Sequence, residues 1–307
     1  MSSAAAARVR AGRRSIAVSS PDKVMFPDVG VTKLELAEHY ARVAPAMVPH
    51  VRERPVTMHV FPGGLDRTGV YIKKAPPHFP DWIPRVTVAK REGETEMALA
   101  NDAAALVFLA NQNCITPHVW PARVDDLRAP DRLIFDFDPP EGTDFGDVRA
   151  AARATGELLR EVGLAPFAMT SGSRGLHVIA PLRRDSGWDE ARAFADAVGE
   201  KVASDDPDHL TTAFRIAKRG GRIYVDTTRN AYAQHGVAPY AVRAKPGAPV
   251  ATPLHWEELD DRKLSSRSWD IRTIGDRLES DGDPWKGMTR NARSLRGPNA
   301  KLAKLSP

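Results

Sequence analysis

The chain has 307 residues, 42% of them hydrophobic, and carries 44 Lys and Arg against 39 Asp and Glu, for a formal charge of +5. That length can bury one large core or two, and the mild basic excess favours an anionic partner. The single cysteine, Cys114, excludes an intramolecular disulfide and a cysteine-based zinc site. No segment approaches the roughly 20 apolar residues that cross a bilayer, and the N-terminus lacks the apolar core of a secretory signal, so we expect a cytoplasmic protein.

Basic residues gather at both ends of the chain. No acidic residue precedes Asp22 and none follows Asp283. We therefore predict a flexible basic tail over residues 1–14, one catalytic domain over 15–283 and a basic tail over 284–307. Such tails suit contact with phosphate groups, and they are equally compatible with disordered solubilising termini.

The predicted elements begin with a helix over 33–47, which follows Thr32 as its N-cap. Two short strands and the start of a buried helix come next, at 57–60, 70–72 and 103–110. The second half then alternates strands and helices, at 132–137, 147–162, 167–170, 176–180, 189–203 and 222–226. This order predicts an α+β fold, with a mixed sheet, flanking helices and a smaller N-terminal subregion.

The strand over 132–137 runs directly into two carboxylates. Asp136 and Asp138 lie on one face of this strand, together with Ile134, because alternate side chains point the same way. Two acids so close repel each other unless a cation lies between them, and hard ions such as Mg²⁺ or Mn²⁺ prefer oxygen ligands. An isolated acidic turn at a strand end is an equally good interpretation of this motif alone.

A second motif, Ser171-Gly-Ser-Arg-Gly-Leu-His177, lies between two predicted strands. Its glycines allow a tight turn, and its hydroxyls and guanidinium are donors of the kind that phosphate oxygens accept. The motif departs from the P-loop pattern, so it does not indicate a P-loop nucleotide site. A plain Gly/Ser hairpin is the alternative.

A third carboxylate, Asp226, ends the strand over 222–226. Three acids on strands could hold two divalent ions about 3.5–4 Å apart, an arrangement that aligns the attacking and leaving oxygens in phosphoryl transfer. Arg219 and Arg243 could neutralise a triphosphate beside them.

In their order along the chain, these motifs resemble the archaeo-eukaryotic primase superfamily, and most closely the polymerase domain of bacterial DNA ligase D and its stand-alone relatives. The resemblance extends over 15–278 and includes Asp22-Lys-Val-Met-Phe-Pro27, Thr32-Lys33 and Ala238-Pro-Tyr-Ala-Val-Arg243. It implies an RRM-like catalytic core.

The resemblance also implies roles for individual residues. The metal ligands would be Asp136, Asp138 and Asp226, holding two Mn²⁺ or Mg²⁺ ions. The incoming nucleotide would be bound by His118, Ser171, Arg174, His177, Arg219 and Arg243. Lys23 and Lys33 would grip a 5′-phosphate, and Tyr71 would contact the template, although Val70 stands where relatives place a second aromatic. Taken singly, His118 is also compatible with a core histidine and the lysines with ordinary surface residues.

The implied function is template-dependent nucleotidyl transfer at short DNA gaps or ends, with a preference for ribonucleotides, Mn²⁺ and 5′-phosphorylated gaps. A separate ligase and an end-binding protein would be partners. One alternative is a DNA-end-binding module with incidental catalysis. Another is a sugar-nucleotide transferase that uses the Asp136/Asp138 pair. An aspartyl-phosphate phosphatase is disfavoured because Pro139 and Pro140 follow Asp138.

Overall fold

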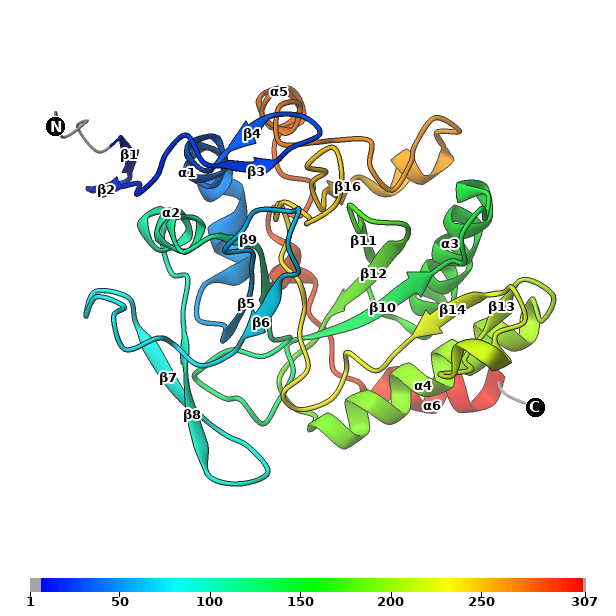
Figure 1. Ribbon diagram of the computed structural model, residues 1–307. Helices are drawn as coiled ribbons and strands as arrows, with labels where there is room; N and C mark the ends of the chain where they lie inside the picture. Colours follow the sequence, from blue (N-terminus) through cyan, green and yellow to red (C-terminus); the bar gives the residue numbers. More distant parts are fainter. Residues whose placement is uncertain (1–6, 306–307) are drawn as a thin grey trace, which may run out of the picture. The chain divides into compact units, whose positions relative to one another are not determined.

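The computed structural model describes residues 7–305 (Figure 1). The chain forms two compact units, each assembled from three segments. The first unit comprises residues up to 120, 237–252 and 269–282, and the second comprises 121–236, 253–268 and the residues from 283 onward. The first unit is therefore not purely N-terminal, because two later segments return to it.

The second unit is built on a six-stranded sheet in the order β13-β14-β10-β12-β11-β16. The strands are β10 (Arg132–Asp138), β11 (Phe167–Thr170), β12 (Leu176–Pro181), β13 (Leu210–Thr211), β14 (Ile223–Asp226) and β16 (Pro253–Leu254). β13 runs parallel to β14 and the other neighbours are antiparallel, so the predicted mixed sheet is confirmed.

Helices of this unit are α3 (Phe145–Val162), α4 (Trp188–Asp205) and α6 (Arg296–Leu305), with 3-10 turns η1 (Ile216–Lys218), η2 (Trp256–Asp260) and η3 (Met288–Asn291). Gly199 of α4 faces Val225, whose Cγ1 would lie 3.6 Å from a Cβ at that glycine. Since side chains alternate along a strand, Asp226 points to the opposite face from α4.

The core of the second unit follows the alternation predicted for β10. Leu133, Phe135 and Phe137 are fully buried, as expected for the core face. Ile134 and Asp136 on the other face are also largely buried, at 6% and 8% exposure. The acid-bearing face of this strand is therefore covered as well, which makes its carboxylates costly to leave without a counter-charge.

The first unit contains a four-stranded sheet in the order β15-β9-β5-β6 and three two-stranded hairpins. Its strands are β1 (Arg8–Ala11), β2 (Arg14–Ala17), β3 (Val24–Phe26), β4 (Val31–Thr32), β5 (Val56–Val60), β6 (Val70–Ile72), β7 (Arg85–Ala89), β8 (Glu94–Ala98), β9 (Cys114–Val119) and β15 (Gly236–Val237). Its helices are α1 (Lys33–Val51), α2 (Ala103–Asn111) and α5 (Ile274–Asp281).

Helix α1 begins where the sequence predicts and continues further. Thr32 and Glu35 form a capping box, in which each side chain bonds the other residue's backbone N–H. The helix continues past Pro45 and Pro49 to Val51, although each proline lacks the N–H for a helical hydrogen bond. Buried residues near the C-terminal end of the helix, Met47 and Val51, supply packing that offsets this loss.

Both predicted tails are wrong for the residues that the structure describes. Over 1–14, residues 1–6 lie outside the described part, but Arg8–Ala11 pairs with β2, with Val9 and Ala11 buried. At the other end, Trp285 and Leu302 are buried and the residues before 306 include η3 and α6. Apolar residues spaced among the arginines and lysines drive this packing. Within 7–305, no helix combines the length and apolar character that crossing a membrane requires.

Candidate metal centre

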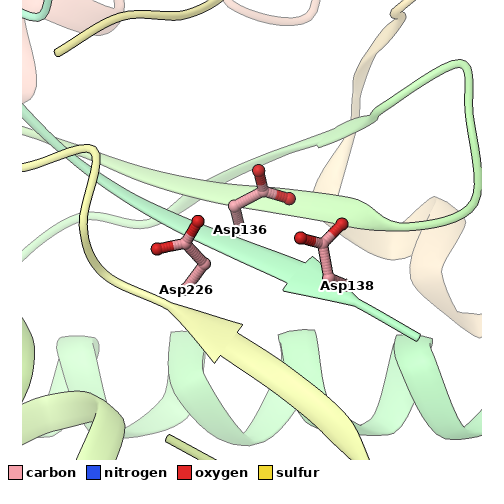
Figure 2. A group of neighbouring side chains, drawn as sticks. All are labelled: Asp136, Asp138 and Asp226. Carbon is pink, nitrogen blue, oxygen red and sulfur yellow. The ribbon is translucent and has the colours of Figure 1, made fainter. Parts of the chain in front are cut away.

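The sheet of the second unit places three functional side chains in one row. In the register of the antiparallel strands, Asp136 of β10 lies opposite Asp226 of β14 on one side and opposite His177 of β12 on the other. Residues paired in this way project from the same face of a sheet. Asp138, two residues along β10, projects from that face as well, and Figure 2 shows the three carboxylates gathered near the ends of β10 and β14.

The geometry of this cluster suits a hard divalent cation. Asp136, Asp138 and Asp226 each offer a ligand oxygen, and these oxygens lie within 4.8 Å of one another. All-oxygen donors are the ligands that Mg²⁺ and Mn²⁺ select. The residues therefore fit the divalent ion that the sequence predicted, with one face of the cluster formed by His177, whose Nε2 lies 3.2 Å from Asp136 Oδ1.

The cluster perturbs the protonation of its own members. Burial, followed by repulsion from Asp136 and Asp226, raises the pKa of Asp138 from 3.8 to about 6. Desolvation and the Asp226 charge raise the pKa of Tyr224 to about 12, so its hydroxyl remains protonated and donates to Asp226 Oδ1 at 3.4 Å. A bound cation would relieve the repulsion among the acids.

We expect Asp138→Asn to stabilise the metal-free protein at neutral pH. The raised pKa means that the folded protein holds this proton at higher pH than the unfolded chain, so wild-type stability falls as pH rises from about 4 to about 6. The variant should therefore gain about 1–3 kcal/mol at pH 7, and the gain should vanish near pH 4. Thermal unfolding in EDTA across this range measures the effect, and a constant difference at all pH values would contradict it.

Arg229 is a site residue that the motifs did not reveal. Its guanidinium lies 3.8 Å from Asp136 Oδ2 and 3.6 Å from Asp226 Oδ2, so one cation bridges two of the acids. The only sequence signal is its position three residues after Asp226, which alone does not distinguish it from other arginines. Its side chain is 33% exposed, so the guanidinium is only partly desolvated beside the acids.

Arg219 is held near this site through an aromatic ring. Its guanidinium donates to the carbonyl oxygens of Ala213 and Phe214, and its Cζ lies 3.9 Å from the centre of the Tyr224 ring. Tyr224 in turn bonds Asp226. The structure therefore places Arg219 one ring away from the acids, as a fixed positive charge.

The Ser171–His177 loop is shaped by its own first hydroxyl. Ser171 Oγ accepts the N–H groups of Ser173 and Gly175, at 3.2 and 3.1 Å. These two hydrogen bonds hold the loop in its turn. Arg174 projects from the loop, exposed, and forms no hydrogen bond or ion pair with any other described residue.

Gly175 allows β10 and β12 to approach each other. A Cβ at this position would lie 1.8 Å from the carbonyl oxygen of Phe137, a backbone atom that cannot rotate away. We expect Gly175→Ala to destabilise the fold by about 2–4 kcal/mol and to misplace His177 relative to Asp136. Gly297→Ala in α6 is the matched control, because nothing lies within 4 Å of its Cβ position. Denaturant unfolding that gave equal stability for the two variants would contradict this prediction.

In the first unit, Lys23 and Lys33 lie together. The Lys33 N–H donates to the Lys23 carbonyl oxygen at 2.8 Å, and Lys33 Nζ donates to Ser19 Oγ at 3.0 Å. Lys23 Nζ bonds the Pro62 carbonyl and Asn113 Oδ1. Among the described residues, neither amine pairs with a carboxylate. Burial and the Lys23 charge lower the pKa of Lys33, a repulsion that a bound anion would relieve.

Tyr71 belongs to a cluster of rings in the first unit. It is 56% exposed and stacks on His59, with ring centres 4.0 Å apart and planes 7° apart, while His118 contacts its edge at 5.5 Å. Burial, Arg243 and Lys245 lower the pKa of His59 to about 4, so this ring is neutral at pH 7. His59 is a second ring beside Tyr71 that sequence analysis missed, because it lies on another strand.

The predicted site residues therefore divide between the two units. The second unit holds those at or next to the acids, namely Asp136, Asp138, Asp226, His177, Ser171, Arg174 and Arg219. The first unit holds Lys23 with Lys33 in one cluster, and Tyr71 with His118 near Arg243 in another.

Comparison with known proteins agrees with this fold. The mostly antiparallel six-stranded sheet of the second unit carries the acid cluster near the ends of two neighbouring strands. The family model described as "LigD, primase-polymerase domain" matches residues 32–285, and the chain belongs to this family.

Individual relatives support the assignment. The chain is 34% identical over 284 residues to the multifunctional non-homologous end joining protein LigD of Pseudomonas aeruginosa, and 33% identical over 281 residues to the corresponding DNA repair protein of Mycobacterium tuberculosis. These alignments cover 92% and 89% of this chain but only 34% and 37% of the relatives, so the chain spans about a third of their length. The solved polymerase domain of Mycobacterium tuberculosis ligase D in complex with DNA superposes with a TM-score of 0.85 at 32% identity, over 90% of this chain and 99% of that one.

Proposed function

We propose that this chain is a template-dependent nucleotidyltransferase that adds nucleotides, with a preference for ribonucleotides, at short gaps or ends in DNA during break repair. The observation that carries the proposal is the alignment of Asp226, Asp136 and His177 across three neighbouring strands, with Asp138 beside them. Membership of the LigD primase-polymerase family supports nucleotidyl transfer over the sugar-nucleotide alternative.

The site residues of the second unit would have different roles in the reaction. Asp136, Asp138 and Asp226 would hold divalent ions, which when bound supply the positive charge that stabilises a transferring phosphoryl group. Arg174 projects into solvent from its loop and would contact the triphosphate, as would Arg219 beside Tyr224. Ser171 would keep this loop in the shape that presents Arg174.

The first-unit residues would recognise nucleic acid and nucleotide. Two ammonium groups without a carboxylate partner suit a terminal 5′-phosphate, which carries more charge than an internal diester. The exposed Tyr71 ring, stacked on His59, offers a face on which a template base can stack. His118 and Arg243 would contact the incoming nucleotide.

The test is primer extension on a gapped duplex with a downstream 5′-phosphate, supplied with labelled ribonucleotides or deoxyribonucleotides and with Mn²⁺ or Mg²⁺. We expect template-directed addition that fills the gap, strongest with ribonucleotides and Mn²⁺. Tight DNA binding without addition under every metal condition would instead support an end-binding module.

A further inference from the structure

The N-terminal hairpin β1–β2 has one apolar face and one arginine-rich face. Val9, Ala11 and Ile16 are buried where the hairpin packs on α1 and α2 (Figure 1). Arg8 and Arg10 alternate with these residues and are exposed. The hairpin precedes residue 32, where the match to the family model begins. The strand is therefore held rigidly by its inner face while its outer face presents cations.

The arginines of this hairpin differ in how they are bonded. Arg8 donates to the hydroxyl and carbonyl oxygens of Ser15, and Arg14 stacks 4.5 Å over the ring of Trp82. Both contacts fasten the two strands in place. By contrast, the side chains of Arg10 and Arg13 are exposed and form no hydrogen bond or ion pair with the other residues in 7–305. Their guanidinium groups are therefore available to an external anion.

The hairpin leads directly into the lysine pair. Strand β2 ends at Ala17, and Ser19, two residues later, accepts a hydrogen bond from Lys33 Nζ and is itself bonded to Asn111. Arg10 pairs in register with Ser15, and Arg13 lies in the turn. At about 3.4 Å per residue, Ser15, which lies opposite Arg10, is at most about 14 Å from Ser19, and Arg13 is at most about 20 Å from it.

These upper limits set how far along a duplex that starts at the lysine pair the hairpin arginines can reach. One DNA strand rises about 3.4 Å per nucleotide, so 14–20 Å corresponds to about four to six base pairs. No acidic side chain occurs before Asp22 to repel the phosphates. Guanidinium groups bind phosphate oxygens through two parallel hydrogen bonds, which favours this partner over a diffuse anionic surface.

We propose that the β1–β2 hairpin binds the phosphate backbone of the duplex downstream of the gap, about four to six base pairs beyond the 5′-phosphate. The inference rests on the proposed function, because it takes Lys23 and Lys33 as the 5′-phosphate site. The hairpin would add a second contact with the phosphate backbone, independent of base sequence, that fixes the position of the downstream duplex.

The test compares R10Q/R13Q with wild type by fluorescence anisotropy on 5′-phosphorylated gapped DNA whose downstream duplex is either about three or about ten base pairs long. We expect wild type to bind the longer duplex about tenfold more tightly, and R10Q/R13Q to lose that gain and about 1.8 of the salt slope. R10K/R13K should recover most of the gain, since it restores the charge. The control R52Q/R128Q removes the same charge at exposed positions elsewhere and should behave as wild type.

Each outcome bears on the hairpin separately from the proposed function. The inference is overturned if R10Q/R13Q still binds the longer downstream duplex more tightly than the shorter one. It is also overturned if the variant loses the same affinity for single-stranded DNA or for vesicles of anionic phospholipid. The ratio of affinities for 5′-phosphate and 5′-hydroxyl ends should be unchanged in R10Q/R13Q, because Lys23 and Lys33 are intact. If wild type binds the two kinds of end equally well, the proposed 5′-phosphate site is wrong. The difference in affinity between the long and the short downstream duplex still tests the role of the hairpin.

Discussion

Replacing Asp136 with asparagine is expected to abolish nucleotide addition, with a loss of about 10³-fold or more, equivalent to about 4 kcal/mol of transition-state stabilisation. Asp136 is central, because it lies beside both Asp226 and His177 in the register of the sheet. Asparagine keeps the shape and one oxygen but removes the charge that would hold the metal. Asp226→Asn should have a similar effect, while its remaining oxygen can still accept the Thr228 N–H.

Stability measurements separate this loss from unfolding. Removing one of three neighbouring carboxylates relieves repulsion, so each variant should unfold in EDTA at the wild-type temperature or above it. Asp205→Asn on α4 is the matched control, because that carboxylate pairs with Lys201. Divalent ions should raise the unfolding temperature of wild type and of this control more than that of Asp136→Asn. Primer extension by Asp136→Asn at close to the wild-type rate would refute the metal assignment.

Replacing either Lys23 or Lys33 with methionine is expected to remove most of the preference for a 5′-phosphate over a 5′-hydroxyl at the gap. Methionine keeps much of the aliphatic volume, which matters because Lys33 is only 3% exposed. A hydrogen bond to a charged group contributes about 1.5–3 kcal/mol, so each variant should lose about ten- to hundredfold in affinity for the phosphorylated gap.

Binding titrations across salt concentrations provide the measurement. The slope of log affinity against log salt should fall by about 0.9 for each phosphate that the variant no longer neutralises. Lys201→Met on α4 is the control, since its amine pairs with Asp205. Addition at saturating DNA should survive in both lysine variants, because the acids are untouched. Equal wild-type affinity for the two kinds of gap would exclude a 5′-phosphate site at this lysine pair.

Local signals in the sequence predicted much of the second unit. The strand over 132–137 and the strand over 167–170 appear where alternation and flanking residues placed them, with β10 extended by one residue to Asp138. The shared face of Asp136 and Asp138 also follows from the two-residue period of a strand. These features depend only on residues adjacent in the chain, so they can be predicted from the amino-acid sequence.

Non-local packing decided the rest. Nothing near Arg229 in the sequence indicates that its guanidinium bridges Asp136 and Asp226, and His59 stacks on Tyr71 only because β5 pairs with β6. The hairpin β7–β8 and strand β9 escaped prediction as well; β7 pairs with β8, and β9 pairs with β5, which lies more than 50 residues earlier in the chain.

The two ends of the chain also show which features the sequence predicts and which depend on tertiary packing. The sequence by itself determined that both ends are basic and that the carboxylates terminate strands. Only the tertiary structure decided that Val9 and Trp285 pack into cores, which turns the expected tails into a hairpin and a helical segment. It also placed His177 beside Asp136, because that contact depends on the register between β10 and β12. The physical reason is that burial and register depend on residues distant in sequence, whereas caps, periodicity and motif order depend on adjacent ones.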